Sequence, residues 1–318
     1  MSGKDVQILQ AADFPSWINE RLASEFTVHR YDRAKDKDGL AKEVAPGIRG
    51  IATSAPEGAD RALIESLPKL EIISSFAVGV DPIDLRAAKE RNVAVANTAG
   101  VLTDCVADIG MALILAAMRG IVQADRYVRS GDWASKGPMG LTTALRGKKL
   151  GVVGLGRIGL ALARRAEAFG MQIQYQNRRR RDDVAYPWFA DAASLAAASD
   201  VLAVVVPGGA ETKHMIDARV LDALGPKGFL VNIARGSVVD EPALIRALKE
   251  KRIAGAGLDV FAEEPRRPDD LAGLDNLVMQ PHHGSATVET RSAMGNLMID
   301  NLLRHFSGEG VPPQYRVV

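Results

Sequence analysis

Short runs of β-branched and other apolar residues alternate with amphipathic stretches along most of the chain. The short runs are typical of buried strands, and the stretches between them repeat apolar residues every three or four positions, as helices do. Such alternation is typical of α/β proteins with parallel sheets. In the first third the pattern predicts strands at Val6–Leu9, Phe26–Tyr31, Gly50–Thr53, Ile72–Phe76 and Val93–Ala96, with helices such as Ala59–Ser66 and Asp84–Arg91 between them.

A second series of the same kind begins at Lys149. Its apolar runs predict six strands with helices between them, which is enough for a complete doubly wound domain. These strands are the segments 149–154, 171–177, 200–206, 228–234, 255–261 and 277–282. The fold class that follows is α/β, with two Rossmann-like doubly wound domains.

The last segment, Thr287–Phe306, reads as one amphipathic helix. Its apolar residues share a face at spacings of three and four; they are Met294, Leu297, Met298, Leu302 and Phe306. A single helix that follows a complete domain needs another surface to cover. We therefore expect it to return to the first domain and pack there, which makes that domain discontinuous in sequence.

Composition narrows the class of protein. The chain has 318 residues, 47% of them hydrophobic and 25% charged, as in a globular protein with room for two domains. A net charge of +1 argues against broad attraction to nucleic acid or to an anionic membrane. Cys105 is the only cysteine, which fits a reducing compartment. With no basic leader and no apolar run of membrane-spanning length, the chain is expected to be cytoplasmic.

The stretch GVVGLGRIG places Gly154, Gly156 and Gly159 directly after a predicted strand and at the start of a helix. In this context Gly154 permits a tight turn, and Gly156 lets backbone amides approach a pyrophosphate. Gly159 allows the helix to pack closely on the strand, and the helix N-terminus stabilises the anion. A glycine-rich turn without a ligand is the alternative, but the βαβ frame favours a dinucleotide site.

The next strand ends at Asn177, where an NAD-specific site usually carries Asp or Glu about 20 residues after the glycines. Four arginines follow, in the stretch NRRRRDD. Asn does not repel a phosphate, and a guanidinium matches phosphate geometry. We therefore expect Asn177, Arg178 and Arg179 to bind the 2′-phosphate of NADP, with NADPH preferred over NADH. Arg180 and Arg181 are expected to be solvated loop charges, and a nucleic-acid patch is the alternative for the whole run.

Three further stretches lie at the carboxyl ends of predicted strands, where α/β sheets bind ligands. They contain Arg235 in VNIARGSVVDEPAL, Asp259 and Glu264 in GLDVFAEEP, and His282 in QPHHGSAT. Beside a nicotinamide, an arginine can hold a 2-keto acid, a histidine can donate a proton, and a carboxylate can orient the histidine. Each residue also has an ordinary structural alternative, such as a surface ion pair or a helix cap.

In these stretches the sequence resembles the D-isomer-specific 2-hydroxyacid dehydrogenase family over nearly its whole length. GLGRIG, NIARGSVVDEPAL, LDVFAEEP, PHHGSAT and the upstream NTAGVLTDCVAD resemble the family's motifs, in the family's order. Asn177 and the arginines that follow it, together with VPGGAET, are most similar to the glyoxylate/hydroxypyruvate reductase branch, which uses NADPH.

The resemblance implies a role for each matching residue. His282 matches the general acid/base, Glu264 the carboxylate that pairs with it, and Arg235 the arginine that binds substrate and polarises its carbonyl group. Val78 and Gly79 match the loop whose amides receive the substrate carboxylate. Arg235 and His282 are also expected to contact the cofactor, and Asp259 matches the partner of the nicotinamide carboxamide. The other positions expected to bind the cofactor are Thr103, Arg157, Ile158, Val206, Pro207, Thr212, Ile233, Ala234 and Gly284.

The resemblance also implies the bounds and the role of each domain. Residues 1–98 and 286–318 form a flavodoxin-like substrate domain, and residues 99–285 form an inserted NAD(P)-binding Rossmann domain. A homodimer is expected, since closed two-fold symmetry is the commonest oligomer and since in similar proteins the loop Arg129–Gly140 helps to form a two-fold dimer. A simply packed Trp133 is the alternative for this loop. No cluster of residues has the spacing of a metal site.

Three questions stay open from sequence alone. His283 stands beside His282 as a rival acid, although neighbouring side chains of extended chain point to opposite sides. The substrate could be a larger keto acid, such as 2-ketogluconate or hydroxyphenylpyruvate, instead of glyoxylate or hydroxypyruvate. The same fold also serves non-enzymatic corepressors that sense a dinucleotide.

Overall fold

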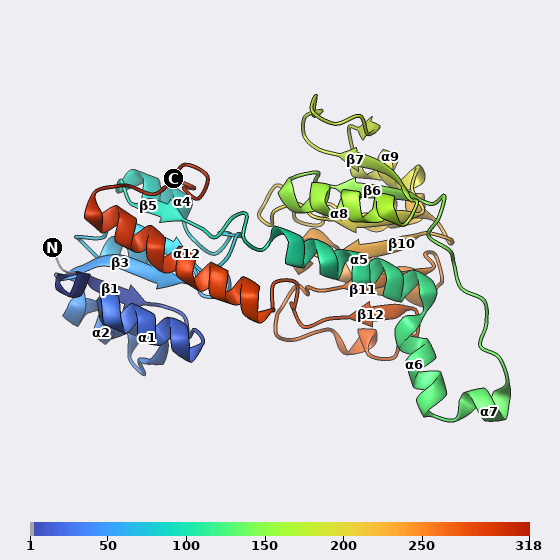
Figure 1. The fold of residues 1–318 in the computed structure, drawn as a ribbon, viewed down its shortest axis with the longest axis horizontal. Helices are drawn as coiled ribbons and strands as arrows, with labels where there is room; N and C mark the ends of the chain where they lie inside the picture. Colours follow the sequence, from blue (N-terminus) through green and yellow to red (C-terminus); the bar gives the residue numbers. More distant parts are fainter. Residues whose placement is uncertain (1–2) are drawn as a thin grey trace. The chain divides into compact units, whose positions relative to one another are not determined.

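The structure is a computed structural model that describes residues 3–318 (Figure 1). It divides into two compact units. One unit combines the described residues up to Leu102 with Thr287–Val318, and the other consists of Thr103–Ala286. Each unit has its own parallel β-sheet, with five strands in the first and seven in the second. The predicted fold class, α/β with two doubly wound domains, is confirmed.

The first unit has strand order β2-β1-β3-β4-β5, which is the flavodoxin-like order. Its strands are β1 (Gln7–Gln10), β2 (Thr27–Arg30), β3 (Ile48–Thr53), β4 (Ile72–Ser75) and β5 (Ala94–Ala96). Its helices before β5 are α1 (Ser16–Glu25), α2 (Lys37–Val44), α3 (Arg61–Ser66) and α4 (Leu85–Glu90). The predicted helices start one or two residues early, because Asp60 and Asp84 are N-caps whose carboxylates accept the amides of Leu63 and Ala87.

The long C-terminal helix α12 (Val288–Ser307) packs on β3 and β4 of this first sheet (Figure 1). The Ser74 hydroxyl of β4 donates to the Met298 carbonyl at 2.9 Å. At Gly295, a Cβ would lie 2.5 Å from the end of the Ile18 side chain, so a larger residue there would force Ile18 of α1 to shift. Both the predicted helix and its packing on the first sheet are confirmed.

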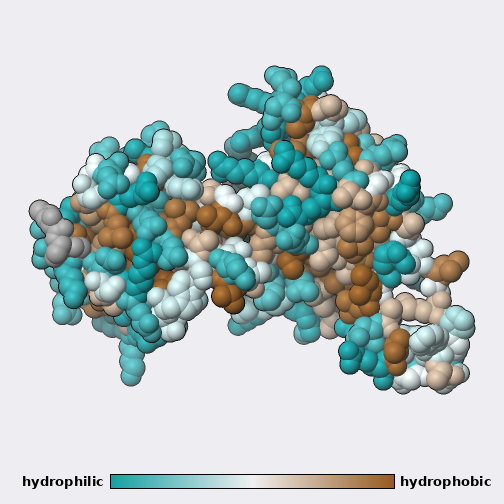
Figure 2. Space-filling view, in the orientation of Figure 1, coloured by the Kyte–Doolittle hydropathy of each residue, from teal (hydrophilic) through white to brown (hydrophobic). Residues whose placement is uncertain are grey.

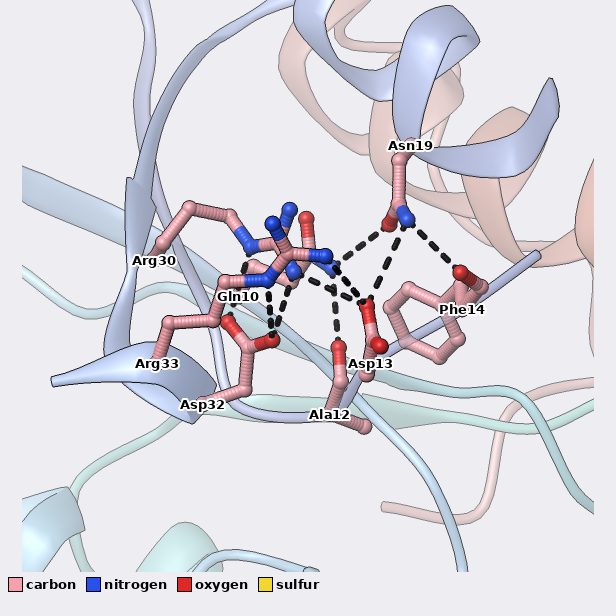
Figure 3. A network of polar contacts seen from close by, with 8 residues as sticks. All are labelled: Gln10, Ala12, Asp13, Phe14, Asn19, Arg30, Asp32 and Arg33. Atoms are coloured by element: carbon pink, nitrogen blue, oxygen red, sulfur yellow. Dashed lines mark hydrogen bonds and ion pairs between the residues drawn. The ribbon is translucent and has the colours of Figure 1, made fainter. Parts of the chain in front are cut away.

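A polar network fixes the loop that follows β1 (Figure 3). The Gln10 amide donates to Asn19 at 2.7 Å, and the Asn19 amide donates to the Phe14 carbonyl at 2.6 Å. Arg30 lies between Asp32 and Asp13, to which it donates at 2.6 and 2.9 Å respectively. The network therefore ties the ends of β1 and β2 to the start of α1.

The second unit has strand order β12-β11-β10-β9-β6-β7-β8, all parallel. Its strands are β6 (Lys149–Val153), β7 (Gln172–Gln176), β8 (Trp188–Phe189), β9 (Val201–Val204), β10 (Phe229–Asn232), β11 (Gly255–Leu258) and β12 (Leu277–Met279). The runs of apolar residues in the sequence predicted all of these strands except β8, which has only two residues and so forms no such run. The strand order reverses between β6 and β9, and the carboxyl ends at this point are where such sheets bind ligands.

Helices cover the second sheet. Those that pack on it or follow its strands are α5 (Thr103–Arg119), α8 (Arg157–Ala168), α9 (Ala192–Ala197), α10 (Ala218–Leu224) and α11 (Glu241–Lys249). The long helix α5 packs on α8, β10 and β11. Among the described helices none is long and apolar enough to cross a membrane by itself. Only α5 with α6 (Ile121–Arg129) reaches that length and composition, and this pair bends by 60°.

The segment that contains α6 and α7 (Asp132–Lys136) carries exposed apolar side chains (Figure 2). The Trp133 side chain is 62% exposed and Leu141 is fully exposed, at 104%. Ile121 and Val128 are also more than half exposed, at 51% and 56%. Grouped exposed apolar residues of this kind are typical of surfaces that a partner covers.

Candidate functional site

The glycine-rich loop has the shape that a dinucleotide requires. Gly154 has a left-handed φ of 98°, and a Cβ there would lie 2.9 Å from the Val206 amide nitrogen. A Cβ on Gly159 would lie 2.3 Å from the Gly154 carbonyl oxygen, so α8 could not pack on β6. A Cβ on Gly156 would meet no atom within 4 Å. Two of the glycines are therefore needed for packing, and the third leaves open space above the start of α8.

The start of α8 fits a bound pyrophosphate. Gly156 is its N-cap and supplies no side chain to the first N–H groups of the helix. These amides, at Arg157 and Ile158 among others, and the positive end of the helix dipole favour an anion in that space. The residues present therefore fit a dinucleotide whose phosphates lie over Gly156.

Asn177 faces this loop, because its side-chain oxygen accepts the Leu155 amide at 2.7 Å. Arg178 forms an ion pair of 2.9 Å with Glu211, which belongs to the loop after β9. Both side chains are more than four-fifths exposed, at 87% and 81%. Arg179 is exposed as well. The segment thus places two accessible guanidinium groups after β7, beside the glycine-rich loop.

The expectation for Arg181 is wrong. Its side chain is only 26% exposed and forms an ion pair with Asp183. Its Nη1 atom donates to the Leu155 carbonyl oxygen at 2.7 Å. Arg180, in contrast, is exposed, as predicted. The contact that holds Arg181 spans 26 residues, so the local pattern of charges carried no sign of it.

His282 and Glu264 form a close pair. The Nδ1 atom of His282 lies 2.6 Å from the Oε2 atom of Glu264. The other Glu264 oxygen accepts the Phe261 amide at 3.0 Å, which fixes the orientation of the carboxylate. Since Nδ1 is directed at a carboxylate, Nε2 is the nitrogen left to exchange a proton with a substrate.

The charge environment keeps Glu264 ionised. Burial raises the pKa of this carboxyl, but three groups outweigh it: the His282 hydrogen bond, the Phe261 amide and the positive charge of Arg235. The pKa of Glu264 therefore lies below its ordinary value of 4.5. An ionised Glu264 can accept a charge-assisted hydrogen bond from Nδ1 of His282.

Asp259 holds the turn that carries His282. Its backbone carbonyl accepts the His282 amide at 2.7 Å. Its carboxylate oxygens accept the amides of His283 at 2.6 Å and Gly284 at 2.9 Å. His282 has a left-handed φ of 52°, which a non-glycine residue rarely adopts, and these three bonds fix that conformation. Burial raises the pKa of Asp259 even though both amides donate to it.

Arg235 follows β10 directly after Ile233 and Ala234, and its Nη1 atom donates to the Ala234 carbonyl at 2.7 Å. The next residue, Gly236, is the reason that this arginine lies near Glu264. A Cβ on Gly236 would lie 1.9 Å from the Phe261 carbonyl carbon, so the loop that carries Glu264 packs directly on the glycine.

Two residues of this site were missed from sequence. Gly236 is one, and the sign that could have revealed it is a glycine directly after the predicted substrate arginine. The other is Glu241, a buried residue of α11 whose carboxylate accepts the Ala262 amide at 2.8 Å. Together they hold the 261–264 loop from two sides.

The remaining predicted positions lie on three other segments. Val206, Pro207 and Thr212 belong to the loop after β9, in which the Thr212 hydroxyl donates to the Pro207 carbonyl at 2.7 Å. Thr103 is the first residue of α5. Val78 and Gly79 lie in the first unit, in the loop after β4. Within residues 3–318, no group of three or more His, Cys, Asp or Glu side chains is arranged to hold a metal ion.

Comparison with known proteins identifies the class. Residues 111–284 match the family model described as D-isomer specific 2-hydroxyacid dehydrogenase, NAD binding domain. The chain belongs to the D-isomer-specific 2-hydroxyacid dehydrogenase family. This family binds a nicotinamide dinucleotide, which agrees with the loop at Gly154–Gly159.

Individual relatives are similar over nearly the whole chain. Glyoxylate/hydroxypyruvate reductase A of Arabidopsis thaliana is 46% identical over 308 residues, which cover 97% of this chain and 98% of the relative. A 2-ketogluconate reductase of Gluconobacter oxydans is 48% identical, with 91% and 92% covered. The solved NADPH-dependent glyoxylate/hydroxypyruvate reductase of Sinorhizobium meliloti, in complex with NADP and malonate, matches with a TM-score of 0.88 and 40% identity, covering 95% of this chain and 94% of that chain.

Proposed function

We propose that the protein catalyses the NADPH-dependent reduction of glyoxylate and hydroxypyruvate to D-2-hydroxy acids. The observation that carries this proposal is the 2.6 Å contact between His282 and Glu264, with the charge of Arg235 acting on the same carboxylate. The site thus combines a proton donor, His282, with its orienting carboxylate, Glu264, and a cation, Arg235. The glyoxylate/hydroxypyruvate reductases among the relatives support the choice of substrate.

In the proposed mechanism each residue has one task. Arg235 and the amides of Val78 and Gly79 bind the substrate carboxylate, and Arg235 also polarises the carbonyl group. The reduced nicotinamide, when bound, supplies the hydride. His282 donates a proton from Nε2 to the substrate oxygen, and Glu264 stabilises the imidazolium before that transfer. Asp259, besides its proposed contact with the nicotinamide carboxamide, keeps His282 in its left-handed conformation.

The assay that tests this function is oxidation of NADPH or NADH by purified protein with glyoxylate and hydroxypyruvate. We expect turnover with both acids, faster with NADPH. The 2-ketogluconate reductase among the relatives favours larger keto acids as a second substrate class, so 2-ketogluconate and hydroxyphenylpyruvate belong in the same assay. Turnover of only the larger acids would replace the proposed substrate. Tight NADPH binding without turnover of any of the acids would favour a sensing role instead.

Preference for NADPH is attributed to Arg178 and Arg179 after Asn177. Changing both arginines to serine is expected to weaken NADPH binding about a hundredfold, because two charge-assisted contacts with the 2′-phosphate are lost. NADH affinity should stay within about twofold, since NADH lacks that phosphate. Equilibrium titration with both cofactors measures the effect, and Arg252→Ser, in the turn after α11, is a control for the loss of one positive charge elsewhere in the unit. Equal losses for both cofactors would contradict the assignment.

The pH dependence follows from the paired groups. The reaction consumes a proton, which His282 is proposed to donate, so reduction is expected to slow as pH rises. On the acid side the pKa of Glu264 is depressed, so its carboxylate stays ionised and the rate should hold until the pH is below about 4.5. The profile of kcat/KM measures both limbs, and Glu264→Gln should remove the acid limb. A flat alkaline limb would contradict proton donation by His282.

We further propose a homodimer that covers the exposed apolar residues of α6, α7 and the following loop. Trp133 and Leu141 would be buried by a second copy, since closed two-fold assembly is the commonest oligomer. Light scattering coupled to gel filtration tests this, and a monomer at micromolar concentration would contradict it.

The single cysteine fits a reducing compartment, so we place the enzyme in the cytoplasm, which fractionation of cells would check.

A further inference from the structure

The peptide groups of Leu155, between the first two glycines of the loop, are both bonded to the segment after β7. The Leu155 amide donates to the side-chain oxygen of Asn177 at 2.7 Å. The Leu155 carbonyl accepts Nη1 of Arg181 at 2.7 Å. The Leu155 side chain is itself buried. The conformation of the glycine-rich loop is therefore fixed by two side chains that lie more than twenty residues further along the chain.

Arg181 is in turn held in place from two directions. Its guanidinium donates from Nε to Asp183 at 2.9 Å and also forms an ion pair with that carboxylate. Its backbone amide donates at 2.8 Å to the hydroxyl of Tyr175, a fully buried residue of β7. The guanidinium is thus oriented toward Leu155 before any ligand arrives, which is how a residue can position a loop.

We propose that Arg181 is a positioning residue of the cofactor site. It holds the glycine-rich loop in the shape that directs the first amides of α8 at the pyrophosphate, and it acts through Leu155. Both NADPH and NADH carry the pyrophosphate, so Arg181 supports the two equally. The inference rests on the proposed function only in that this loop receives a dinucleotide.

The charges separate this role from that of the neighbouring arginines. Asp183 neutralises Arg181, and the Leu155 carbonyl takes up one of its donors. Arg178 is 87% exposed and its partner Glu211 is nearly as exposed, so water screens that pair and a phosphate can replace the carboxylate. Arg178 is therefore the group suited to the 2′-phosphate, whereas Arg181 supports the loop beneath.

The test compares Arg181→Met with Arg180→Met, a matched control because Arg180 is the adjacent, exposed arginine. Fluorescence titration of each purified variant with NADPH and with NADH is expected to show about tenfold weaker binding of both cofactors for R181M. The ratio of the two affinities should stay unchanged, and R180M should bind like the unaltered protein. A loss confined to NADPH would overturn the proposal, because it would make Arg181 a direct reader of the 2′-phosphate. Unchanged affinity for both would overturn it as well.

Hydrogen exchange of the protein without cofactor gives a readout that does not depend on activity or on cofactor preference. Amides of residues 154–160 are expected to exchange faster in R181M than in R180M, and Asp183→Asn should give an intermediate rate. If the proposed reductase activity fails, this result still stands or falls by itself. Unchanged exchange in R181M and in D183N would show that the loop is held without Arg181, and the proposal would be wrong.

Discussion

Replacing His282 by asparagine is expected to lower kcat for reduction of glyoxylate about a thousandfold, because a positioned proton donor contributes that much to such a step. The variant keeps a side chain of similar size that can still donate to Glu264, so the surrounding turn should survive. Asp259 holds that turn through backbone groups, which the substitution leaves in place. Steady-state oxidation of NADPH measures the change, and titration with NADPH should show that cofactor binding persists.

His283 supplies the matched control. Its backbone amide donates to Asp259, whereas its imidazole is exposed, and Glu264 pairs with His282 instead. His283→Asn is therefore expected to change kcat by no more than about threefold, the range of an exposed side chain that makes no catalytic contact. If His283→Asn abolished turnover and His282→Asn spared it, the roles of the two histidines would have to be exchanged.

The strands were the easiest part of the fold to predict. Parallel strands are buried on both faces, so they appear in the sequence as continuous apolar runs such as 228–234. The two-residue strand β8 has no such run and forms only because it pairs with the end of β7. The predicted helix starts were one or two residues early. An N-cap residue such as Asp60 stands directly before the helix, and the apolar pattern does not distinguish it from the first helical residue.

The functional residues also fall into two groups, those that a local sequence motif reveals and those that only tertiary contacts reveal. The residues proposed to carry the chemistry could be singled out from the sequence, because Arg235, Glu264 and His282 each lie in a short motif at the end of a strand. The groups that orient them could not, since they act through tertiary contacts. Gly236 matters because of how closely Phe261 approaches it, and Arg181 because of a carbonyl in a distant loop. No spacing within a motif contains that information.

Changing Arg235 to methionine is expected to lower kcat/KM for glyoxylate about a thousandfold. In the proposed mechanism the substitution removes a donor to the substrate carboxylate and a cation beside the developing charge on the carbonyl oxygen, each worth about a factor of ten or more. Arg235→Lys keeps the charge but not the planar fork, so it should recover only part of the loss. Steady-state kinetics with glyoxylate measures kcat/KM for the unaltered protein, Arg235→Lys and Arg235→Met, which should decrease in that order.

A second readout separates this role from simple damage to the fold. The positive charge of Arg235 helps to lower the pKa of Glu264, so its removal should let that pKa rise, and the acid limb of kcat/KM should move toward neutral pH. Arg235→Lys, which retains a positive charge, should leave the limb near its original place. A large loss of rate in Arg235→Met with an unmoved acid limb would mean that Arg235 binds substrate without acting on the His282–Glu264 pair.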